Sequence, residues 1–311
     1  MTPSYAGRLL LLSSASFFLV QMAAAALIAL LAPAAIRRAM AMRPHHAARF
    51  LLTLRLLPAA FSAIVVAALC VPSYLRFEPR AAEEEVGFVC VAAAILGAIL
   101  CTVAISKAVS VLIRSSRYVR ECGGMASQIE GEPVWIVHRS AGLALAGILH
   151  PRLLISEGAL RRLSGDQLAV ALEHERAHRS SRDNMKRLLM LLAPPVFPRL
   201  RLLERAWIKT AEWAADDQAT GGDPVRSVLL AGALVSVARL QTGVSMPALI
   251  TSLVEADEDL SPRIGRLLDR PVYESNLRGG WIAIAGGALL ILAIAASSLD
   301  TIHRLLERLL D

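Results

Sequence analysis

The sequence predicts a mainly α-helical membrane protein, with four transmembrane helices and an α+β domain inserted between the third and the fourth. Three observations carry this prediction. The 311 residues are 55% hydrophobic but only 5% aromatic, with a mean hydropathy of +0.53, whereas ordinary soluble proteins are about 45–50% apolar. Four apolar stretches are long enough to cross a bilayer. The chain between the last two stretches is long enough to bury a core of its own.

The four apolar stretches divide the chain into three parts. They cover about residues 9–36, 56–75, 86–113 and 281–299. The first is longer than the apolar core of a secretory signal, about 7–15 residues, so we interpret it as a retained helix. The predicted parts are three transmembrane helices in residues 1–113, an inserted domain in 114–278, and a fourth helix with a short outer tail in 279–311.

The charged residues between these helices predict the orientation, because arginine and lysine concentrate on the cytoplasmic side. The connection over residues 37–55 holds five arginines, and three more follow the third helix, whereas the second connection carries Glu83–Glu85. We therefore place the amino terminus outside and the inserted domain in the cytoplasm. The inner loops also account for the net charge of +7, so we expect a lipid bilayer as partner and no direct binding of nucleic acid.

The inserted domain begins with β-like runs and continues with helices. Residues 134–137, 143–149 and 151–156 have the composition of short strands. Ser164 is a favourable N-cap, and Gln167 stands where it completes a capping box. These signals predict a helix over residues 165–181. The four cysteines include no Cys-x-x-Cys pair, which argues against a cysteine metal site or a disulfide framework.

A His-Glu-x-x-His motif lies on this predicted helix, at His174, Glu175 and His178. One helical turn separates the two histidines, so both imidazoles project from one face and can bind a single metal ion. Glu175 is rotated by about 100° and can act as the general base on a metal-bound water without being a ligand. The simpler alternative is a polar helix whose histidines are solvated or satisfied within the core.

A second predicted helix, residues 204–220, offers a third ligand. Catalytic zinc takes three protein ligands and a water. Glu212 can complete the set, and Asp216, four residues further on the same face, can accept a hydrogen bond from a ligand imidazole. The alternative is a solvated acidic patch that includes Asp217. The pattern therefore predicts one catalytic Zn²⁺ ion, bound by the two histidines and Glu212.

These motifs resemble those of the BlaR/MecR-type membrane metallopeptidases. The similar residues are Leu172 to His178, Arg182, Asp183, Glu212, Ala215, Asp216, and Pro262, Arg263 and Ile264 with Leu267 and Leu268. That family places its gluzincin domain in the cytoplasm, between the third and fourth transmembrane helices. The resemblance implies a gluzincin-like zinc peptidase in the bacterial inner membrane, with Asp183 supporting a ligand histidine as Asp216 does.

The resemblance also implies a cytoplasmic protein as substrate, namely a small winged-helix repressor of the BlaI/MecI type that is cleaved in signalling. Penicillin-sensing members continue after the fourth helix into a large extracellular domain, and this chain stops within about a dozen residues. We therefore expect no penicillin-binding sensor. General turnover of proteins, without a dedicated repressor, is the alternative role. A scaffold with a vestigial site is disfavoured by the intact ligands and base. Whether the chain forms a homodimer stays open.

Two apolar segments leave alternatives open. The run over residues 143–149 is either an edge strand that pairs with an extended substrate or a core strand of the sheet. The candidate substrate contacts are Leu143, Ala144, Leu145 and Ala146. Residues 188–198 either lie against the membrane or form the end of a core helix.

Overall fold

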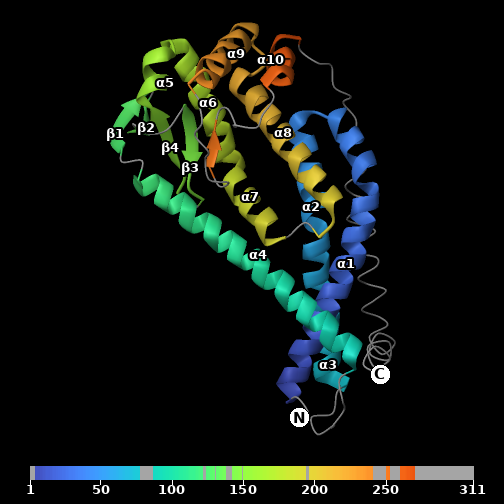
Figure 1. The fold of residues 1–311 in the computed structure, drawn as a ribbon. Helices are drawn as coiled ribbons and strands as arrows, with labels where there is room; N and C mark the ends of the chain where they lie inside the picture. Colours follow the sequence, from blue (N-terminus) through green and yellow to red (C-terminus); the bar gives the residue numbers. More distant parts are fainter. Residues whose placement is uncertain are drawn as a thin grey trace.

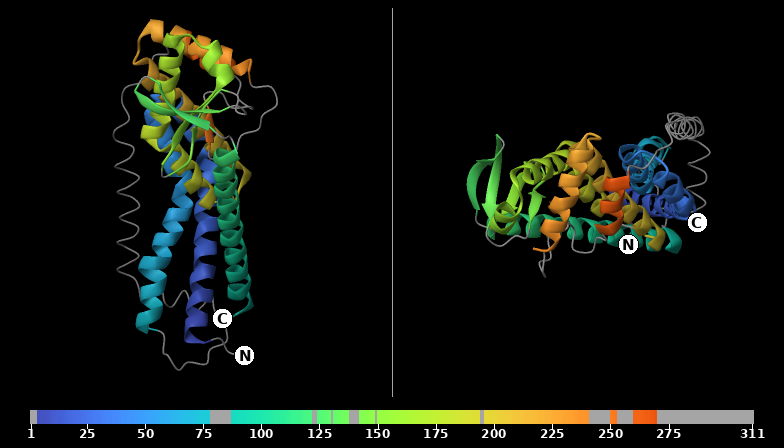
Figure 2. Two further views of the ribbon diagram at one scale, coloured as in Figure 1. Left: turned by 90° about the vertical axis from the view of Figure 1, so that its left-hand side faces the viewer. Right: turned by 90° about the horizontal axis from the view of Figure 1, so that it is seen from above.

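The computed structural model describes residues 4–77, 87–121, 124–129, 131–137, 142–148, 150–193, 196–240, 250–252 and 260–269. Within these residues the protein is mainly helical, with three long apolar helices and one small mixed sheet (Figure 1). The long helices form one end of an elongated molecule, and the sheet with the shorter helices forms the other (Figure 2).

The three long helices agree with the first three predicted spans. They are α1 (Tyr5–Met40), α4 (Phe88–Glu121) and one continuous helix over Pro44–Phe77. The last comprises α2 (Pro44–Val65), the π-helical turn η1 (Val66–Cys70) and α3 (Val71–Phe77). Each is long and apolar enough to cross a membrane. The predicted fourth span, residues 281–299, and the tail after it lie outside the described residues.

The predicted basic loop over residues 37–55 is wrong. α1 continues to Met40 and α2 begins at Pro44, so only residues 41–43 join them. Buried alanines and leucines, among them Ala47 and Leu51, alternate at helical spacing with exposed basic residues. At about 1.5 Å per residue α1 is about 54 Å long, well beyond the roughly 30 Å of a bilayer core. Parts of α1 and α2 therefore extend into the inserted domain (Figure 1).

Close packing between α1 and α4 depends on small residues. A Cβ atom on Gly97 would lie 2.8 Å from the backbone oxygen of Ser14 and 3.2 Å from Cβ of Phe18. Ala93 and Ala94 are buried one turn earlier on the same helix. Small side chains let two helix backbones approach, as membrane helices commonly do.

The inserted domain holds a five-stranded sheet. Its strands are β1 (Gly124–Ile129), β2 (Glu132–Val137), β3 (Leu143–Ala146), β4 (Arg152–Ser156) and β5 (Ile250–Ser252), in the order β1-β2-β4-β3-β5. β2 and β4 are parallel, and the other neighbouring pairs are antiparallel. The predicted strands over residues 134–137 and 151–156 are confirmed as β2 and β4, whereas the third strand ends at Ala146 instead of continuing to residue 149.

The structure corrects the interpretation of this third strand as an edge strand. β5 pairs with β3 on the side away from β4, with Ala144 opposite Ser252 and Leu145 opposite Thr251. All four side chains of Leu143–Ala146 are buried. The alternative holds: β3 is a core strand, because a segment about a hundred residues later in the sequence occupies the position where a substrate would have paired.

The helices of the domain pack on this sheet and on the membrane helices. They are α5 (Glu157–Arg162), α6 (Gly165–Ser181), α7 (Asp183–Leu192), α8 (Pro198–Thr220), α9 (Pro224–Ala238) and α10 (Leu260–Asp269). One apolar core joins the sheet to α6 and α9, through residues such as Leu145, Ile155, Leu172 and Leu234. Burial of such side chains is the main stabilising contribution.

A second apolar core joins α8 to the membrane helices. Leu200, Leu203 and Trp207 of α8 pack among buried residues of α1 and α2, including Ile28 and Leu51. Met190, near the end of α7, is buried in the same cluster, whereas Leu189 and Leu192 are exposed. The first part of the segment 188–198 is therefore the end of a helix that is packed on one face, and residues 194–195 lie outside the described part.

Candidate metal centre

Helix α6 begins and ends as the sequence predicts. The Ser164 hydroxyl accepts a hydrogen bond from the backbone N–H of Gln167, and the Gln167 side chain accepts one from the backbone N–H of Ser164. This capping box satisfies backbone donors that the first turn would otherwise leave unpaired. The helix then runs from Gly165 to Ser181 and places the His-Glu-x-x-His motif in its second half.

The structure brings the three predicted ligands together. One ligand atom from each of His174, His178 and Glu212 lies within 4.8 Å of the other two, and all three side chains are buried. The Nε2 atoms of the histidines are 3.1 Å apart, and each lies 3.4 Å from a carboxylate oxygen of Glu212. Burial excludes solvated histidines and a solvated acidic patch, whereas histidines satisfied within the core are compatible with burial alone.

Glu175 lies beside this group without joining it. The side chain is fully buried, and neither carboxylate oxygen has a hydrogen-bond partner among the described residues. Burial raises the pKa of Glu175 to about 6, against the attraction of the two neighbouring histidines. A carboxylate with a pKa near neutrality can both accept and return a proton at physiological pH.

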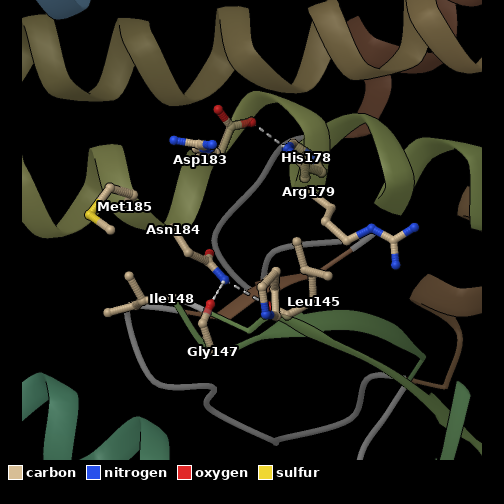
Figure 3. A pocket seen from close by; sticks show the side chains of 10 residues that line it. Leu145, Gly147, Ile148, His178, Arg179, Asp183, Asn184 and Met185 are labelled. Carbon is tan, nitrogen blue, oxygen red and sulfur yellow. Dashed lines mark hydrogen bonds and ion pairs between the residues drawn. The ribbon is translucent and has the colours of Figure 1, made fainter. Parts of the chain in front are cut away.

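His178 is oriented by a residue close to it in sequence. Its Nδ1 lies 2.7 Å from Oδ2 of Asp183 (Figure 3). Oδ1 of Asp183 accepts a hydrogen bond of 2.7 Å from Lys186. Arg182 has a left-handed backbone conformation (φ 54°), which ends α6 and lets α7 begin at Asp183. The turn directs the Asp183 side chain back to the histidine.

His174 is oriented by residues distant in sequence. Its Nδ1 lies 3.0 Å from Oδ1 of Asp216 on α8. Arg263 of α10 donates two hydrogen bonds of 2.8 Å to the same carboxylate, from Nε to Oδ2 and from Nη2 to Oδ1. Asp216, predicted from its spacing, and Asp183, implied by the family resemblance, thus each lie against the Nδ1 of one histidine.

Sequence reasoning gave no role to Arg263, although it belongs to the late run that carried the family resemblance. The side chain is only 1% exposed. Besides Asp216, its Nη1 lies 3.1 Å from Oε2 of Glu212, and its Nη2 lies 3.2 Å from Nε2 of His174. The only sequence signal is an arginine among the apolar residues of an amphipathic helix. That signal does not reveal its partner, Asp216, which lies 47 residues earlier in the chain.

The charges in this group shift each other's pKa strongly. Burial opposes ionisation of Glu212 and Asp216, but His178 and Arg263 outweigh it for Glu212, and Arg263 does so for Asp216. The pKa of Glu212 therefore lies well below its usual value, and that of Asp216 falls to about 2. Burial likewise opposes protonation of His178, but the nearby carboxylates of Glu212 and Asp183 raise its pKa well above the usual value.

The donor set fits a divalent metal ion. Each histidine has its Nδ1 on an aspartate, so its Nε2 is the atom that faces the other histidine and Glu212. A metal ion would bind there in place of the proton that the carboxylates otherwise stabilise on His178. Neither oxygen of Glu212 makes a well-formed hydrogen bond within the described residues. Four carboxylates meet here, those of Glu175, Glu212, Asp183 and Asp216. Among the described residues, the arginine and lysine side chains that reach them are those of Arg263 and Lys186, so with neutral histidines the group is short of positive charge. A doubly charged cation would balance the group.

A hollow of about 380 Å³ opens beside His178 (Figure 3). Asn184 forms one side of it and ties α7 to the end of β3, donating hydrogen bonds to the backbone oxygens of Leu145 (3.1 Å) and Gly147 (2.8 Å). The other lining residues are Ile148, Pro151, Arg179, Arg182, Asp183 and Met185. Of the three candidate ligands, His178 is the one that lines the hollow.

Helix α8 is also fixed to α2 by a partly buried ion pair. Arg55 of α2 is 2% exposed, lies 3.6 Å from Glu204 of α8, and donates a hydrogen bond of 3.2 Å to the backbone oxygen of Met190. Together with the apolar core around Trp207, this contact sets the position of the helix that carries Glu212 and Asp216.

No family model matches the sequence, and a search of curated proteins finds no similar one. The resemblance to the BlaR/MecR type therefore stands on the motif residues alone, and the peptidase assignment stays a prediction.

Proposed function

We propose that the protein is an integral-membrane zinc metalloendopeptidase that cleaves a cytoplasmic protein. The observation that carries the proposal is the buried group of His174, His178 and Glu212, with the unpaired carboxylate of Glu175 beside it. Two histidines, one carboxylate and an adjacent free carboxylate form the donor set typical of zinc peptidases. Zinc is preferred because imidazole and carboxylate ligands in a small buried site suit it.

In the proposed mechanism, a zinc ion would be held by His174, His178 and Glu212 and would supply Lewis acidity, which acidifies water and polarises a carbonyl. Asp183 and Asp216 hold the Nδ1 atoms of the two histidines, so that their Nε2 atoms stay unprotonated and directed at the ligand position. Both tasks require carboxylates that remain ionised, in agreement with the low pKa of each.

Glu175 acts as the proton carrier of the reaction. Its carboxylate takes a proton from the attacking water and returns it to the amine that leaves when the peptide bond breaks. No hydrogen bond to another described residue competes for these oxygens. The pKa of about 6 keeps the group mostly ionised at neutral pH, ready to accept a proton, yet basic enough to hold it until the amine departs.

The proposed location is the bacterial inner membrane, which the chain would cross several times, with the amino terminus outside and the metal centre on the cytoplasmic side. Three membrane-spanning helices support the membrane location, and the positive-inside rule supports the orientation. For the biological role we favour cleavage of a BlaI/MecI-like repressor in signalling, on the motif resemblance. Turnover of proteins without a dedicated partner is the alternative.

The test compares two purified variants of the full chain, Glu175→Gln and Glu173→Gln. Glu173 is the matched control, because it lies on the same helix and pairs at the surface with Arg176, away from the centre. Glu175→Gln should retain one zinc ion per chain and lose about 10²- to 10⁴-fold of peptide hydrolysis, measured with denatured casein. Glu173→Gln should behave as wild type. Equal cleavage by both variants would contradict the proposal.

The substrate is identified by comparing the proteomes of cells that produce the wild type or Glu175→Gln. A single repressor that accumulates in the variant supports signalling, and many stabilised membrane proteins support general turnover.

A further inference from the structure

Arg263 is unusual among the residues of the centre because it brings a positive charge to a place where a metal cation is expected. Its guanidinium lies 3.1 Å from Glu212, a ligand, and forms a two-bond contact with Asp216, the support of another ligand. All three side chains are buried. The arginine and a bound metal ion would therefore neutralise the same carboxylates.

The contacts of Arg263 exclude a direct role in substrate binding. Nε and Nη2 donate to Asp216, Nη1 faces Glu212, and Nη2 also lies against His174. The side chain is 1% exposed, so no substrate group reaches it without displacement of α10. Its effect must act through the residues that it touches.

We infer that Arg263 is a built-in counter-cation that keeps the centre folded when the metal is absent and lowers the affinity for the metal when it is present. Without a metal, Arg263 is the only arginine or lysine among the described residues in contact with both Glu212 and Asp216; His174 also contacts both but carries a charge only when protonated. Unpaired buried carboxylates are strongly destabilising. With a metal bound, a cation of charge +2 and the guanidinium repel each other across the same carboxylates.

The metal can load and leave without unfolding of the domain, so the proposed activity can follow the supply of zinc. The inference rests on the proposed metal centre but not on peptide hydrolysis.

Arg263 sits on a helix that has a second, separate attachment. Arg266, one turn further along α10, pairs with Asp217 and lies over the ring of Trp213, 5.4 Å from its centroid. This contact holds α10 to α8 without touching Glu212 or Asp216. Arg266→Gln is therefore the matched control, since it weakens the docking of α10 but leaves the charge of the centre unchanged.

The experiment measures thermal unfolding of the detergent-solubilised full chain after chelation and at graded free Zn²⁺, with affinity taken from competition with a chromophoric chelator. Arg263→Gln should lower the melting temperature of the metal-free protein and enlarge the increase in melting temperature that zinc causes. It should also tighten zinc binding by roughly 5- to 150-fold, the usual range of coupling between two sites. Arg263→Lys should restore wild-type behaviour in part, and Arg266→Gln should leave the zinc-induced rise unchanged.

The opposite sign overturns the inference. If Arg263 only orients the ligands, Arg263→Gln weakens zinc binding and shrinks the zinc-induced rise. Should metal-free Arg263→Gln fail to fold, it is purified with zinc: unfolding upon chelation, while Arg263→Lys stays folded, supports the inference. A wild type that binds no zinc contradicts the proposed metal centre itself, whereas a wild type that binds zinc with a smaller effect in Arg263→Gln contradicts only the role of Arg263.

Discussion

The two histidines of the centre are supported in the same way by two different kinds of structure. In the local arm, His178, Asp183 and Lys186 lie within nine residues of chain, around one turn between α6 and α7. In the long-range arm, His174, Asp216 and Arg263 come from three helices and span 89 residues of sequence separation. Each arm runs from imidazole to carboxylate to cation.

The arms differ in their exposure to water. Lys186 has a side chain that is 28% exposed, whereas Arg263 is 1% exposed. A cation that reaches water can lose its partner at little cost, while a buried one cannot. The aspartates of the two arms should therefore contribute similarly to metal binding. To the stability of the fold, the aspartate of the long-range arm should contribute far more.

The largest effect is expected from Asp216→Ala, which breaks the long-range arm. The change leaves Arg263 without its two-bond partner in the core, so we expect a loss of about 3–5 kcal/mol in the free energy of unfolding and roughly 10- to 100-fold weaker zinc binding. Chemical denaturation and chelator competition measure the two quantities. Asp217→Ala, the exposed neighbour, should cost less than about 1 kcal/mol; equal losses would remove the distinction.

Asp183→Ala breaks the local arm. We expect a similar loss of zinc affinity, about 10- to 100-fold, because His178 loses the acceptor for its Nδ1–H. The loss of stability should be smaller, about 1–3 kcal/mol, since Lys186 can turn to solvent. Measured by the same denaturation and competition assays, a stability loss as large as that of Asp216→Ala would show that the arms are equivalent.

Glu175 belongs to neither arm, and its replacement should stabilise the metal-free protein. The pKa of about 6, against an ordinary value of 4.5, means that folding binds the proton more tightly. The stability that this proton contributes is present below pH 4.5 and is lost as pH rises through 6. At pH 8 the free energy of unfolding of metal-free Glu175→Gln should therefore be about 2 kcal/mol larger than that of the wild type. This difference should disappear below pH 4.5. A constant gap from pH 4 to pH 8 would contradict this origin.

The smallest effect is expected from Lys186→Ala at the outer end of the local arm. The ion pair with Asp183 is partly exposed, so the change should cost less than about 1 kcal/mol and alter zinc affinity only a few-fold. Calorimetric titration with zinc checks the second figure. Loss of binding comparable to that of Asp183→Ala would mean that Lys186, and not the histidine contact, fixes the carboxylate.

Much of the metal centre could be predicted from the sequence, because spacing along a helix brings its residues to one face. The capping box at Ser164 fixes the start of α6, and a four-residue interval places His174 and His178 on one face. Glu212 and Asp216 follow the same rule on α8.

Other features could not be predicted, since they depend on contacts between distant segments. The basic residues before Arg55 suggested a loop, because the helix α8 that covers their apolar neighbours lies about 150 residues later. Leu143–Ala146 suggested an edge strand, because pairing with β5 leaves no trace in either segment.

The sequence by itself determined the three long apolar helices, the helix that carries the motif, and the three residues that could hold a metal ion. Helical periodicity and capping are local properties, and each acts within about one turn of chain. Tertiary structure alone decided that Arg263 enters the centre, that α1 and α2 hold α8, and that β3 is enclosed. Those contacts depend on which surfaces meet when the chain folds, and many pairings satisfy the same local pattern.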